Sequence, residues 1–150
     1  MAIRADIDGE AAVAELWPVD GPYDPQHFAE AMLALQHLVR YSNHATLEAP
    51  SSVLPEPHDA ATVIRRLADG IGGLGQLLDQ LADRCDALAQ DPTLRSATGA
   101  REPDPRRAAT AASAELRTAG SGVDVLRTTV QRAASAMNNL YRDDENGDDQ

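Results

Sequence analysis

Glu30, His37 and His44 are side chains that could bind a metal ion or transfer protons, and they recur at intervals of seven residues. This spacing places them on one stripe of a helix, almost opposite the apolar residues Phe28 and Leu35. Two helical turns separate neighbours by about 10.5 Å, whereas one metal ion needs ligands three or four residues apart or ligands from other helices. We therefore interpret the stripe as a solvated polar face.

A second candidate group is acidic and lies on one side of a predicted helix. It consists of Asp79, Asp83 and Asp86. Three carboxylates could bind a divalent cation, but in an antiparallel hairpin they would lie near arginines of the last helix, among them Arg117. We favour ion pairing. Di-iron bundles need Glu-x-x-His motifs on facing helices, and the sequence contains none.

Cys85 is the single cysteine, which excludes an intramolecular disulfide framework and a zinc site built from several cysteines. It occupies a predicted core position, where a thiol is inert. Serine and histidine residues occur without the local signature of a nucleophile. The sequence therefore predicts no catalytic residue, no metal ligand and no cofactor, and we expect a protein that is not an enzyme.

A run of glycines lies in the middle of the apolar pattern of residues 59–90, which continues through it. A loop that binds phosphate would need a strand before the glycines, but a helical pattern continues on both sides of them. Each glycine inside a helix costs about 0.8 to 1 kcal/mol relative to alanine, so close packing should compensate. The run consists of Gly70, Gly72, Gly73 and Gly75.

A hairpin that turns near Ala97 would place this run level with Gly120 and Gly122. We favour a close crossing of two helix backbones at this point. Two alternatives stay open, a break in the helix and a slot for a small ligand. We call the six glycines Gly70, Gly72, Gly73, Gly75, Gly120 and Gly122 the glycine waist.

The elements that would position these residues are helices. A short helix is expected over residues 9–17, ended by Pro18, and a long one over 25–45, where Asp24 caps the start and Pro25 fits the first position. Residues 47–58 contain three prolines and are predicted to be extended.

Two longer helices are expected over residues 60–90, capped by Asp59, and 105–141, opened by Asp104. Apolar residues alternate at spacings of four and three in both, a pattern typical of helices packed against helices. At about 1.5 Å per residue each would span about 45 to 55 Å. The apolar positions are Leu67, Ile71, Leu74, Leu78, Leu81, Cys85 and Leu88, then Ala112, Leu116, Ala119, Val123, Leu126, Val130, Ala133, Met137 and Leu140.

The predicted fold class is therefore all-α, an elongated antiparallel bundle of three long helices plus a short N-terminal helix. Residues 1–142 are predicted to form one domain, and residues 143–150 an acidic disordered tail.

The net charge of −11 argues against binding to nucleic acid or to anionic lipid. No signal peptide and no apolar run of membrane-spanning length are found, so we expect a cytoplasmic protein. All basic residues are arginine and alanine is abundant, a composition that indicates a GC-rich, actinobacterial genome.

The segment Arg40-Tyr-Ser-Asn-His-Ala-Thr46, with the later segment Gln76-Leu-Leu-Asp-Gln-Leu81, resembles a group of small, mostly helical actinobacterial proteins of uncharacterised function. The resemblance covers residues 32–90 and implies a helical fold and an actinobacterial source, without implying an activity.

The helix over residues 25–45 is shorter than the other two, so part of their hairpin should stay uncovered and expose an apolar seam. We expect a non-catalytic interaction or scaffolding protein whose partner is itself, as a homodimer, or another helical protein. The alternative is a module that binds a small ligand or metal near the glycine waist. The possible interface residues are Leu67, Leu74, Leu81, Val123, Val130 and Met137.

Overall fold

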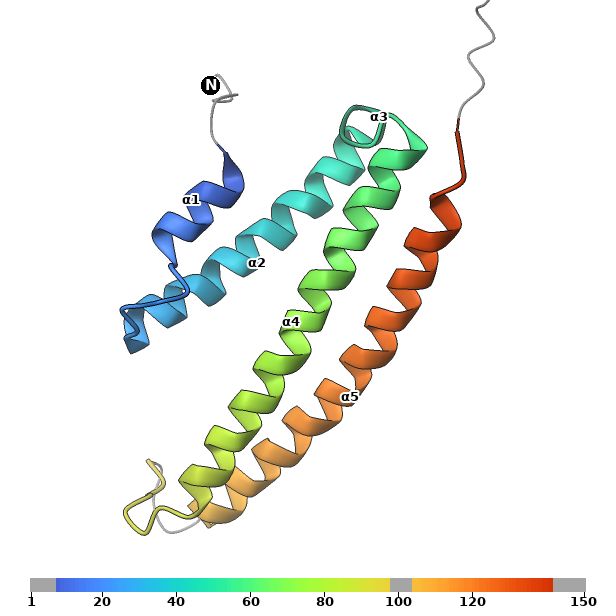
Figure 1. Ribbon diagram of the computed structural model, residues 1–150. Helices are drawn as coiled ribbons and strands as arrows, with labels where there is room; N and C mark the ends of the chain where they lie inside the picture. The colour runs from blue at the N-terminus through green and yellow to red at the C-terminus, as the bar shows by residue number, and fades with distance from the viewer. Residues whose placement is uncertain (1–7, 98–103, 142–150) are drawn as a thin grey trace, which may run out of the picture. The chain divides into compact units, whose positions relative to one another are not determined.

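The computed structural model describes residues 8–97 and 104–141, and all secondary structure in these ranges is helical (Figure 1). Three long helices and a short N-terminal helix are present, so the all-α prediction is confirmed. The chain divides into two compact units, Met1–Val53 and Leu54–Gln150. The single domain over residues 1–142 stays a prediction, and the predicted tail, 143–150, lies outside the described residues.

The first unit begins with α1 (Gly9–Leu16), whose first turn is capped by Asp8. The carboxylate of Asp8 accepts the backbone N–H groups of Glu10 and Ala11 at 3.0 and 3.2 Å. The long helix of this unit, α2 (Pro25–Glu48), starts where predicted, because Asp24 Oδ1 accepts the backbone N–H of His27 at 2.9 Å.

The connection after α2 is more helical than predicted. The extended conformation expected for residues 47–58 is wrong, since α2 continues to Glu48 and a further helical turn, α3 (Pro50–Val53), follows. Proline lacks a backbone N–H, but the N–H groups in the first turn of a helix have no hydrogen-bond acceptor within the helix, so no bond is lost. Pro50 therefore starts a turn instead of preventing it.

The second unit is a hairpin of two 33-residue helices, α4 (Pro57–Ala89) and α5 (Pro105–Met137), packed antiparallel (Figure 1). The start of α4 lies earlier than expected, because Pro57 occupies the first position. Asp59, the predicted cap, instead accepts the backbone N–H of Glu56 at 3.2 Å from inside the first turn. Helix α4 runs unbroken through its glycines, which excludes the predicted alternative of a helix break.

Small residues form the seam between α4 and α5. In the described ranges no large side chain is fully buried, and the hairpin buries alanine, glycine and serine instead. Small side chains let two helices approach closely, because interaxial distance depends on the residues at the contact. The seam consists of Ala61, Ala68, Gly75, Ala82 and Ala89 of α4 with Ser113, Gly120 and Ala134 of α5.

Next to this seam lies one half-buried apolar row on each helix. Apart from Ile64, the residues of these two rows belong to the predicted heptad patterns, so seven of the sixteen predicted positions lie next to the seam. They consist of Ile64, Ile71, Leu78 and Cys85 on α4, and Leu116, Val123, Val130 and Met137 on α5.

The remaining predicted positions form a second row on each helix, farther from the seam, in which Leu81 and Leu88 are half-buried and the others are exposed. Leu67 and Leu74, which were named as possible interface residues, have 56% and 38% of their surface exposed. Leu126 of α5 is likewise 51% exposed. When a helix has small or apolar residues in several rows, any of these rows could face the neighbouring helix. In α4 the row of alanine and glycine is the one that is buried against α5.

Candidate interaction surface

Contacts around two glycines define how α4 and α5 are aligned. A Cβ atom added to Gly75 would lie 3.4 Å from Val123 Cγ1, and one added to Gly120 would lie 3.2 Å from Asp79 Oδ1. Gly120 is therefore level with Asp79, about one helical turn beyond Gly75. The two glycine runs, expected to lie level, are displaced along the hairpin by this turn.

The members of the glycine waist thus have different environments. Gly75 and Gly120 are buried in the seam. Gly72 lies beneath the side chain of Arg127, whose Nε would be 3.0 Å from an added Cβ. The remaining three, Gly70, Gly73 and Gly122, have nothing within 4 Å of an added Cβ and so point away from the seam.

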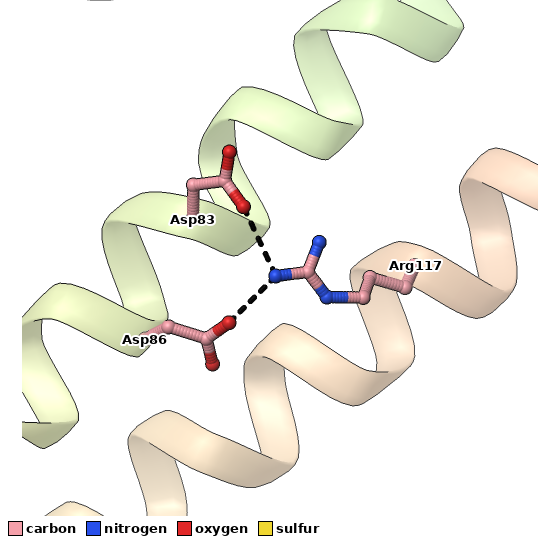
Figure 2. Close-up of polar contacts among 3 residues, drawn as sticks. All are labelled: Asp83, Asp86 and Arg117. Carbon is pink, nitrogen blue, oxygen red and sulfur yellow. Dashed lines mark hydrogen bonds and ion pairs between the residues drawn. The ribbon is translucent and has the colours of Figure 1, made fainter.

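One flank of the hairpin, the polar flank, carries charged side chains that link the two helices. Arg117 Nη2 donates to Asp83 Oδ1 at 3.0 Å and to Asp86 Oδ2 at 2.6 Å (Figure 2). Hydrogen bonds from Ser113 and Arg117 hold the pKa of Asp86 below its usual value. The predicted ion pairing is therefore present for two of the three aspartates. The polar flank consists of Arg65, Asp79, Asp83, Asp86, Arg117, Arg127 and Asn138.

We expect Asp86→Asn to destabilise the hairpin at neutral pH, because the carboxylate loses its charged hydrogen bonds with Ser113 and Arg117. A lowered folded-state pKa contributes stability above the unfolded value of 3.8, and this contribution is lost as the pH falls through the folded-state pKa. The difference between wild type and variant in thermal midpoint should therefore shrink below pH 3.8.

The control for this experiment is Asp69→Asn, which alters an exposed carboxylate of α4 that makes no ion pair in the described chain. Its effect should be small at every pH. Equal effects of the two substitutions across the pH range would contradict a specific role for Asp86.

The opposite flank, which we call the apolar flank, lacks charged residues in its central rows. In an antiparallel pair, rows that lie on the same side of the seam share a flank, so the leucine row of α4 lies beside an alanine-rich row of α5. Leu67 and Leu74 of this row are exposed, and Leu81 and Leu88 are half-buried. The apolar flank consists of Leu67, Leu74, Leu81 and Leu88 of α4 with Ala112, Ala119, Leu126 and Ala133 of α5.

The predicted interface residues fall into two groups. Leu67, Leu74 and Leu81 lie on the apolar flank, while Val123, Val130 and Met137 lie half-buried in the row of α5 next to the seam. Leu126, which was not among the predicted interface residues, is exposed on the same flank, and its heptad position indicated an apolar row there. The three polar residues at intervals of seven on α2, Glu30, His37 and His44, are exposed.

The first unit contains a cavity of about 530 Å³, lined in part by Trp17, Tyr23, His27 and Phe28. Trp17 and His27 contribute a tilted ring pair with centroids 6.1 Å apart. The cavity belongs to a different part of the chain from the glycine waist, where the sequence placed a possible ligand slot.

No family model matches the chain, and the searches of curated proteins and of solved structures also returned no match. Within the described residues, no helix is long and apolar enough to cross a membrane.

Proposed function

We propose that this is a non-catalytic, cytoplasmic interaction protein that self-associates through the apolar flank of the α4–α5 hairpin. The observation that carries the proposal is the exposure of Leu67, Leu74 and Leu126 along one flank, at 56%, 38% and 51%. Fully burying a leucine contributes about 1.5 to 3 kcal/mol, so each of these half-exposed side chains offers about 1 kcal/mol to a partner.

The composition of the seam supports the same proposal. The fully buried residues of the hairpin are only alanine, glycine and serine, and its larger apolar side chains are at most half-buried, so apolar surface remains for a partner to cover. Helical stability in proteins comes mainly from packing of an apolar face, and a further helical layer would supply that packing. No cofactor is part of the proposed function.

A pair of matched substitutions tests the proposal. Leu67→Gln should weaken self-association by about thirtyfold, because it removes about 1 kcal/mol of apolar burial at each of two equivalent positions, about 2 kcal/mol per dimer. Val125→Gln should leave it unchanged, since Val125 is 68% exposed but lies away from the apolar flank. Sedimentation equilibrium of the full chain measures the dimer dissociation constant of each variant. A wild-type protein that stays monomeric at micromolar to millimolar concentration would contradict self-association.

A further inference from the structure

We infer that two copies of this chain pair about a two-fold axis parallel to the helices, so that α4 of each copy lies against α5 of its partner. This inference rests on the proposed self-association and specifies its geometry. Three features of the apolar flank support it, namely the match of large and small side chains, the open glycines at its edges and the sign of its two charges.

The first feature is the alternation of size across the flank. The contacts of Gly75 with Val123 and of Gly120 with Asp79 place Leu67 level with Ala133 and Leu81 level with Ala119. An axis parallel to the helices preserves these levels and exchanges α4 for α5. Leucines of one copy would then face alanines of the other at most levels, which allows the side chains to interdigitate.

An axis perpendicular to the helices gives a poorer fit. It would place the leucine row of α4 on the same row of the partner and leave alanines facing alanines. Large residues would collide at one side of the interface while voids remained at the other, and both are unfavourable. The parallel axis is therefore the arrangement that fills the interface evenly.

The second feature is the position of two glycines at the edges of the flank. We call edge rows the row of α4 that contains Val63, Gly70, Leu77 and Arg84 and the row of α5 that contains Ala108, Glu115, Gly122, Thr129 and Ala136. Neither Gly70 nor Gly122 has any atom within 4 Å of an added Cβ. The parallel axis places Leu77 opposite the partner's Gly122. A leucine that packs onto a glycine would compensate for the helix-forming cost of that glycine.

The third feature is charge. The edge rows contain one charged residue each, Arg84 on α4 and Glu115 on α5, and neither forms an ion pair within the described chain. These residues lie at the same level, so the parallel axis brings Arg84 opposite the partner's Glu115, twice per dimer. A chain with a net charge of −11 would thus meet its copy through opposite charges.

A charge exchange tests this pairing in the full chain. Arg84→Glu and Glu115→Arg should each weaken the dimer about tenfold, because each creates two like-charge contacts, and the double variant should regain the wild-type constant. Glu115→Arg is the more informative single variant. It reduces the net negative charge, so general repulsion between copies predicts tighter association where the proposed pairing predicts weaker association.

Two glycine substitutions provide an independent test. Gly122→Leu should weaken the dimer at least tenfold, since it overfills the site of the partner's Leu77 at two equivalent positions. Gly73→Leu, at an exposed glycine outside the apolar flank, should leave the dimer constant unchanged. Both replace a helical glycine, so circular dichroism should show that neither variant loses helix.

Sedimentation equilibrium of these variants tests self-association and the parallel two-fold axis separately. Weakening by both single charge variants with recovery in the double variant supports the parallel axis. A dimer that is insensitive to the charge variants and to Gly122→Leu, yet weakened by Leu67→Gln, overturns this geometry and leaves self-association standing. A wild-type monomer overturns self-association itself.

Discussion

Ala82→Leu is expected to destabilise the hairpin by about 1 to 3 kcal/mol, because it adds a large side chain where two helices are closest. Ala82 is 0% exposed, and its row contains only alanine and glycine. Leucine favours helix nearly as well as alanine, so the change in free energy of unfolding would report packing and not helix propensity. Urea unfolding followed by circular dichroism measures it.

Ala87→Leu is the matched control for this substitution. Ala87 lies on the exposed outer face of α4, where a leucine meets solvent. Its effect should stay within about 0.5 kcal/mol. Because self-association makes the apparent stability depend on concentration, both variants and the wild type must be compared at the same protein concentration. If Ala82→Leu were as mild as Ala87→Leu, the close seam would be contradicted.

Leu78→Ala is expected to destabilise the hairpin by about 2 kcal/mol. Leu78 belongs to the half-buried row of α4 next to the seam, and its removal leaves a gap beside α5. Truncation of a buried leucine to alanine costs about 2 to 5 kcal/mol, and partial exposure places this site at the lower end. Thermal and urea unfolding should agree on the size of the loss.

Val125→Ala provides the comparison, because Val125 is 68% exposed on α5. We expect a change within about 0.5 kcal/mol for it. Similar losses for Leu78→Ala and Val125→Ala would mean that the row containing Leu78 does not pack against α5.

Part of the candidate surface could be predicted from the sequence. Leu67, Leu74 and Leu81 were named as possible interface residues, and the structure places them on one flank, where Leu67 and Leu74 are exposed and Leu81 is half-buried. Val123 and Val130 were named with them, but these side chains lie next to the seam. A heptad pattern shows which rows are apolar, but it does not show which row faces the neighbouring helix.

The sequence by itself determined where α2 and α5 begin and that the fold is all-α. Asp24 and Asp104, each followed by proline, open α2 and α5 as predicted, because a cap depends on residues within one turn of each other. Only the tertiary structure decided which row is buried and how the two helices of the hairpin are aligned. The alanine and glycine row became the seam, and Gly120 came to lie level with Asp79 instead of the first glycine run. The physical reason is that seam and alignment depend on how two whole surfaces fit, a property that residues far apart in the chain share.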